Sequence, residues 1–154
     1  MPSFQSTCKA NNNPPGTLVV HCSEHGFQGG IHDFLENSLH LNFNYDLLII
    51  PGGPQSLTLV EYLPKFAWAG WKWFRYLVDS HELKRLILIA HQDCGWYKSL
   101  PFHLRDARDP RARQEEDLRR VERRLTKDFP GLSVELYFAG ENAEDRVTID
   151  AIAV

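Results

Sequence analysis

Four short apolar segments alternate along the chain with longer segments in which apolar residues recur at helical spacing. The apolar segments are 17–21, 45–50, 86–91 and 132–139. Continuous apolar runs of this length are typical of strands that are buried on both faces of a parallel sheet. The segments 29–41, 61–80 and 110–129 are long enough for helices. The alternation predicts a single-domain α/β fold, in which a parallel sheet of about four strands carries helices on both faces.

Local signals set several boundaries of these elements. Asp109 is predicted to cap the helix over 110–129, with Pro110 in its first turn. The sequence Pro51-Gly52-Gly53-Pro54 requires a sharp turn after the second strand. Residues 1–16 are polar and rich in Asn and Pro, so we expect a lead segment or arm ahead of one domain over 17–154.

The predicted helix over 61–80 is apolar on more than one side. Phe66, Trp73 and Leu77 fall on one side of a helical projection, and Trp68 and Trp71 fall on another. A helix of this kind usually has two partners, the sheet and a second surface. The residues could also form one large core, but exposed aromatic patches seldom go unused, which favours a homodimer interface.

Composition and charge narrow the classes of partner. The chain has 154 residues, 43% of them hydrophobic, and a formal net charge of −3. The segment 105–124 contains eight arginines, but acidic residues nearly cancel them, and Leu118, Val121 and Leu125 form an apolar stripe. This pattern predicts a solvated, ion-paired helix face and no nucleic-acid partner. No apolar stretch approaches the ~20 residues of a membrane span. The N-terminal residues lack the basic start and apolar block of a signal peptide, so we expect a cytoplasmic protein without a membrane partner.

Three residues that bind soft metal ions lie at the ends of two predicted strands. Cys22 follows the first strand, His91 closes the third, and Cys94 comes three residues later. The carboxyl ends of parallel strands share one edge of a sheet, so these side chains can converge. Each cysteine alone could be an ordinary buried thiol, and Cys8 is expected to be a bystander. Together, two thiolates and one imidazole suit a tetrahedral Zn²⁺ with a fourth position left for water.

These motifs resemble those of the β-class carbonic anhydrases. In that family the first strand ends in C-x-D-x-R, the second in a turn that contains glycine, and the third in H-x-x-C-G. Here the corresponding segments are Cys22-Ser23-Glu24-His25-Gly26, Pro51-Gly52-Gly53-Pro54 and His91-Gln92-Asp93-Cys94-Gly95. The resemblance covers about residues 17–139. It implies the strand order 2-1-3-4, one Zn²⁺ per chain on Cys22, His91 and Cys94, and a homodimer or a dimer of dimers.

The resemblance also implies an activity, the reversible hydration of CO2 to bicarbonate by zinc-bound hydroxide. Glu24 would orient the hydroxide, and His25 is the nearest candidate for moving the proton, unless it is only an exposed loop histidine. The family's aspartate is here Glu24, and its arginine is Gly26; Arg75 or Lys98 could supply the missing cation.

Two alternatives follow from these departures. If Glu24 or His25 became a fourth ligand, the site would be closed and the protein would be a catalytically inactive zinc-binding relative. The same open site could instead hydrolyse other small electrophiles, such as COS or CS2.

Overall fold

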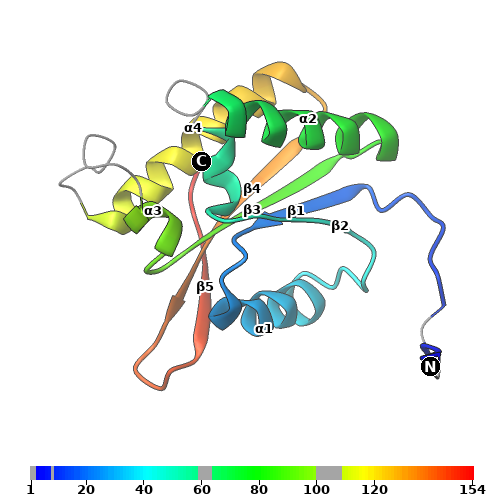
Figure 1. Ribbon diagram of the computed structural model, residues 1–154, viewed down its shortest axis with the longest axis horizontal. Coiled ribbons are helices and arrows are strands. Elements are labelled where there is room, and N and C mark those ends of the chain that lie inside the picture. The colour runs from blue at the N-terminus through cyan, green and yellow to red at the C-terminus, as the bar shows by residue number, and fades with distance from the viewer. Residues whose placement is uncertain (1–2, 8, 59–63, 100–108) are drawn as a thin grey trace.

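A five-stranded sheet forms the centre of the fold, and helices cover both of its faces (Figure 1). The computed structural model describes residues 3–7, 9–58, 64–99 and 109–154, and of 64–67 only the backbone. The strands are β1 (Thr17–His21), β2 (Asp46–Ile49), β3 (Arg85–His91), β4 (Ser133–Glu141) and β5 (Val147–Ala151). The helices are α1 (His25–Asp33), α2 (Pro64–His81), α3 (Gly95–Ser99) and α4 (Pro110–Asp128), with a π-helical turn η1 (Phe34–Ser38) and a 3-10 turn η2 (Gly53–Leu57).

The strands lie in the order β2-β1-β3-β4-β5. The first four pair in parallel, which confirms the predicted order 2-1-3-4. The expected sheet of about four strands lacks β5, which pairs antiparallel with β4. β5 was missed because it is short and half-exposed and follows a polar turn, so it carries no continuous apolar run.

Side chains alternate between the two faces of the sheet, as they must in a strand. One face carries a cluster that includes Leu18, Val20, Leu86 and Leu88 and packs against α2 and α4. The other carries Val19, Ile87 and Ile89, which pack against α1 and η1. Both sides of the central strands are therefore covered, which explains their continuous apolar sequence.

The first helix begins at His25, not at residue 29, and it contains three glycines. A Cβ on Gly30 would lie 2.4 Å from Cβ of Val147, so β5 approaches the backbone of α1 too closely for any side chain. Glycine disfavours a helix in isolation, and the sequence therefore predicted a later start. The tertiary contact with β5 explains why glycine is present at this position.

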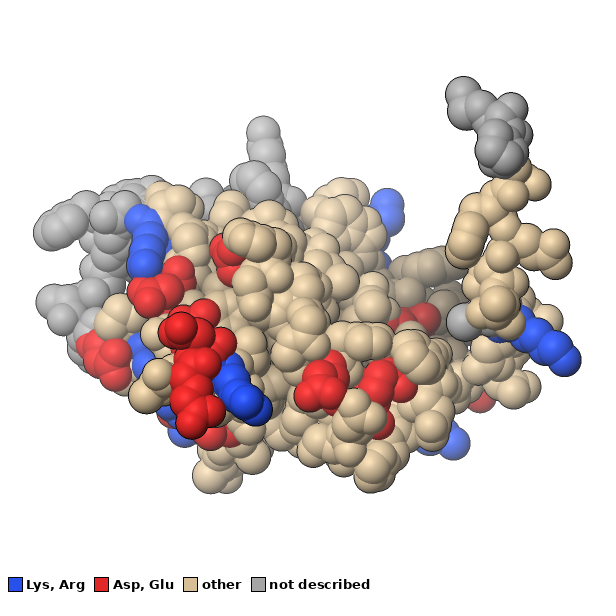
Figure 2. All heavy atoms as spheres, turned by 90° about the horizontal axis from the view of Figure 1, so that it is seen from below, with Lys and Arg blue, Asp and Glu red and all other residues tan. Residues whose placement is uncertain are grey.

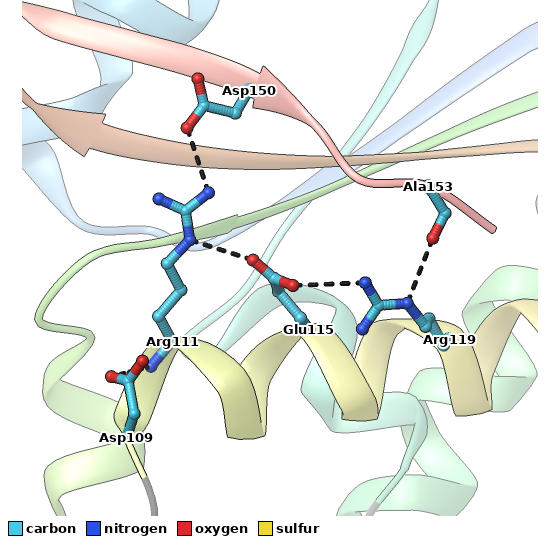
Figure 3. A network of polar contacts seen from close by, with 6 residues as sticks. All are labelled: Asp109, Arg111, Glu115, Arg119, Asp150 and Ala153. Carbon is cyan, nitrogen blue, oxygen red and sulfur yellow. Dashed lines mark hydrogen bonds and ion pairs between the residues drawn. The ribbon is translucent and has the colours of Figure 1, made fainter.

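Helix α4 carries the ion-paired outer face that the sequence predicts. Asp109 caps it by accepting a hydrogen bond from Arg111 N, which confirms the predicted N-cap. Arg111 also pairs with Glu115 and with Asp150 of β5, while Arg119 pairs with Glu115 and donates to the backbone oxygen of Ala153 (Figure 3). This network attaches the C-terminal strand to α4. On the face of the molecule in Figure 2, basic and acidic side chains lie side by side at the left end, while acidic side chains alone are seen near the middle.

Helix α2 presents aromatic residues to the core and to the surface. Trp71 and Phe74 are buried against the sheet, whereas Trp68, Trp73 and Tyr76 are at least half exposed. The side chain of Phe66 lies outside the described residues. None of the described helices is both long enough and apolar enough to cross a membrane.

The described residues of the N-terminal segment, 3–7 and 9–14, are exposed and run away from the sheet (Figure 1). Asn11 contacts the body of the protein through a hydrogen bond to Asn44 Oδ1. Cys8 lies outside the described residues. The division into an arm over 1–16 and a domain over 17–154 stays a prediction.

Candidate metal centre

Cys22, His91 and Cys94 come together at the carboxyl edge of the sheet. β1 and β3 are neighbours in parallel register, so the residues that follow them lie side by side. The three possible ligand atoms all lie within 4.8 Å of one another, and the two sulfurs are 3.9 Å apart. All three side chains are buried. The convergence that the sequence predicted is therefore present in the structure.

The environment of the His91 ring fits metal ligation through one nitrogen. Nδ1 lies 2.7 Å from the backbone oxygen of Gln92, which fixes the proton on Nδ1. Nε2 is buried and has no hydrogen-bond partner among the described residues. Histidine ligands commonly donate their second N–H to a backbone carbonyl in this way. The buried Nε2 is thus an acceptor whose lone pair a cation would satisfy.

The two thiols differ in their surroundings. A hydrogen bond from the Cys94 thiol lowers the pKa of Cys22, and the Gly52 N–H, 3.3 Å from Cys22 Sγ, adds to this effect. The same hydrogen bond, together with burial, raises the pKa of Cys94, although backbone N–H groups of Tyr97 and Trp96 oppose the rise. The hydrogen bond between the two sulfurs thus favours the thiolate form of Cys22 and the protonated form of Cys94. A bound cation would favour the thiolate form of both.

The turn after β2 is shaped by close approach to this centre. Gly52 and Gly53 have φ values of 77° and 51°. A Cβ on Gly53 would lie 2.8 Å from the backbone nitrogen of Cys22, and one on Gly52 would lie 2.3 Å from the Trp96 ring. The predicted sharp turn is confirmed. Its contacts with Cys22 and Trp96 depend on tertiary structure and were not predicted.

A hollow of about 440 Å³ opens beside Cys22, and Glu24 and His25 contribute to its wall. Glu24 is 38% exposed, and its Oε1 lies 3.0 Å from Nδ1 of His25, which is 97% exposed. Neither residue joins the group of close ligand atoms, which among the described residues consists of the two cysteines and His91. In this structure the protein therefore offers three ligands, with a carboxylate at the rim of the adjoining hollow.

No ion pair among the described residues joins Glu24 to Lys98 or Arg75, the cations that could replace the family's arginine. Lys98 pairs with Asp93 Oδ1 at 2.7 Å. Arg75 lies exposed on α2. Of the described residues, His25 is the one whose side-chain nitrogen lies within ion-pair distance of Glu24.

A buried pair anchors the segment that carries Cys94. The Tyr97 hydroxyl donates to Asp117 Oδ2 over 2.9 Å, and Arg113 Nε lies 3.3 Å from the same oxygen. Burial raises the pKa of Tyr97 well above its ordinary value. The charge pattern over 105–124 predicted that its acidic residues, Asp117 among them, lie on a solvated face. For Asp117 this prediction is wrong, since its side chain is 3% exposed. The available signal was its place beside Leu118, on the edge of the apolar stripe.

Comparisons with known proteins identify the fold. No family model and no curated protein matches the sequence. Several solved structures match. Among them are a carbonic anhydrase from Glaciozyma antarctica (14% identity, TM-score 0.53, 83% of this chain and 78% of that one) and a carbonic anhydrase from Streptococcus mutans (13%, 0.52, 94% and 87%). Another is β-carbonic anhydrase isoform I from Trichomonas vaginalis (10%, 0.55, 94% and 87%). The chain thus has a divergent β-carbonic-anhydrase-like fold, as the motifs implied. Identities of 10–14% show the fold and not the activity.

Proposed function

We propose that Cys22, His91 and Cys94 bind one Zn²⁺ and that the protein catalyses the reversible hydration of CO2. The observation that carries this proposal is the buried Nε2 of His91, without a partner among the described residues, beside two thiols 3.9 Å apart. Two sulfurs and one nitrogen are a ligand set that zinc prefers, and three protein ligands are typical of catalytic rather than structural zinc sites.

Zinc in such a site would supply Lewis acidity, which lowers the pKa of water to about 7. Glu24 would accept a hydrogen bond from the water that attacks CO2 and so fix its orientation. His25, which already pairs with Glu24 and is almost fully exposed, would pass the released proton to solvent. Phe27, whose ring packs 4.8 Å from that of His91, would hold the imidazole in place.

A catalytically inactive zinc protein is the second candidate, and one observation favours it. No arginine among the described residues pairs with Glu24, and Gly26, at the family's arginine position, has open space around it. Glu24 also has one methylene more than the family's aspartate, so its carboxylate could reach the metal and close the site. An exposed histidine partner restrains it only weakly.

Metal analysis and stopped-flow CO2 hydration separate these two functions. The enzyme proposal predicts one zinc per chain and a rate above that of the buffer. Glu24→Gln should lower the rate and leave the zinc content unchanged, while the matched Glu144→Gln, in the exposed β4–β5 turn, should change neither. One zinc per chain with no rate above the buffer would overturn the enzyme proposal. Zinc loss in Glu24→Gln would show that Glu24 is a ligand.

We also propose that the chain forms a homodimer, or a dimer of dimers, through the exposed aromatic face of α2. Trp68 and Tyr76 are 66% and 65% exposed there. Exposed apolar patches usually mark an interaction site.

A cytoplasmic location remains our expectation, because a reducing compartment would keep both thiols available for metal.

A further inference from the structure

A second cavity, of about 180 Å³, lies beside the hollow at the metal centre. Its wall is almost entirely apolar and comes from the end of β2, from η2, from α2 and from α3. Pro51 and Trp96 line both cavities, so the two share a wall. The proposed hydration of CO2 makes no use of this second space.

Gly70 of α2 keeps part of the cavity open. Glycine is the least favourable residue after proline in a helix interior, and no backbone of the described residues approaches Gly70 closely enough to require it. A Cβ on Gly70 would make ordinary contacts, 3.4 Å from Ser56 Oγ and 3.7 Å from Leu57 Cδ2. A longer side chain would extend into the cavity that Gly70 lines. The glycine is therefore explained by the empty volume beside it.

Ser56 supplies a polar atom at this wall. The residue is 8% exposed, and its Oγ has no hydrogen-bond partner among the described residues. Burying a hydroxyl without a partner is unfavourable. A ligand atom that pairs with it would recover that loss. The cavity's lining residues carry no charge, so a charged ligand would lose its hydration without compensation.

We propose that this cavity binds a small uncharged molecule with one ring, or a short branched chain, and a single hydroxyl or carbonyl group that pairs with Ser56 Oγ. The size argues for one ring, since an engineered apolar cavity of about 150 Å³ binds benzene. Because the site does not include the metal ligands, binding is expected with or without zinc.

Titrations of the full chain with 4-fluorophenol and 4-fluorotoluene, followed by ¹⁹F NMR, test this proposal. We expect saturable binding of both with dissociation constants in the millimolar range or below. Ser56→Ala should weaken the binding of 4-fluorophenol about five-fold, since one neutral hydrogen bond contributes a factor of roughly 2 to 12 to affinity. The affinity for 4-fluorotoluene should stay unchanged. Gly70→Leu should fill the cavity and so lower the affinity for both probes at least about ten-fold.

Gly29→Leu is the matched control, because Gly29 lies in α1 with open space around it, and it should change neither affinity. If Gly70→Leu does not fold, Gly70→Ala serves instead, with a smaller loss of affinity for both probes. Non-saturable binding, or binding that survives Gly70→Leu, would overturn the proposal. The proposal would also be overturned if the affinity for the probes falls at protein concentrations at which the chain self-associates. A second copy of the chain, rather than a small molecule, would then occupy the cavity.

Discussion

The Gly52 amide donates a hydrogen bond to Sγ of Cys22 over 3.3 Å, which joins the turn after β2 to the end of β1. The neighbouring Gly53 packs directly on the Cys22 backbone. The side chain of Cys22, which we propose as a zinc ligand, is thus positioned by main-chain contacts from a turn 30 residues away. The Pro-Gly-Gly-Pro sequence can bring the chain this close because it has no side chains at its centre.

Gly53→Ala should therefore damage both stability and metal binding. Alanine in the left-handed backbone conformation costs roughly 1–2 kcal/mol. Its Cβ would also lie 2.8 Å from the backbone nitrogen of Cys22. We therefore expect a loss of about 2–4 kcal/mol in the free energy of unfolding. Gly16→Ala is the matched control, because Gly16 also has a positive φ but open space around it. Denaturant unfolding checks both. Equal losses in the two variants would contradict the packing argument.

Asp117→Asn should loosen the segment that carries Cys94. The substitution weakens the hydrogen bond from Tyr97 and removes the charge paired with Arg113, at a cost of about 1–3 kcal/mol in the free energy of unfolding. Faster zinc release to a chelator should accompany this loss, and Tyr97→Phe should show the same effect. Asp128→Asn is the control, since its pair with Arg124 is exposed and long at 3.8 Å. Unchanged zinc release in the Asp117 variant would limit the pair to a structural role.

Glu135 predicts a specific pH dependence of stability. The Arg85 guanidinium, with a further contribution from Tyr137, lowers the pKa of Glu135 from 4.5. A carboxyl group with a lowered pKa stabilises the fold above its unfolded pKa, and this stabilisation is lost as the pH falls through the folded pKa. The effect of Glu135→Gln should thus be constant above about pH 5, at roughly 1 kcal/mol or less, and shrink below it. Urea unfolding at several pH values measures it, and an effect that grows on acidification would contradict the assignment.

The exposed face of α2 predicts that Trp68→Lys combined with Tyr76→Lys will shift the protein toward monomer. Charges on an apolar interface cost binding energy because they must be dehydrated. Sedimentation velocity over a range of concentrations checks this. Lys84→Trp, which adds an aromatic at an exposed position outside α2, controls for nonspecific effects. A wild-type chain that is monomeric at all concentrations would rule out the interface.

Much of this fold could be predicted because its central strands are buried on both faces and read as continuous apolar runs. The convergence of Cys22, His91 and Cys94 could be predicted as well, since strand ends meet at one edge of a parallel sheet. β5 and the early start of α1 could not, because both depend on the contact between Val147 and Gly30, which lies beyond local sequence. Asp117 was misplaced for a similar reason, since an acidic residue among arginines resembles a surface residue until Tyr97 is seen beside it.

Zinc K-edge absorption spectroscopy on protein purified with its metal tests the central claim most directly. The account predicts one zinc per chain, bound by two sulfurs at about 2.3 Å, one imidazole nitrogen at about 2.0–2.1 Å and one further light atom. Cys22→Ser should convert the shell to one sulfur. Protein that takes up no zinc, or a shell without two sulfurs and a nitrogen, would contradict the account.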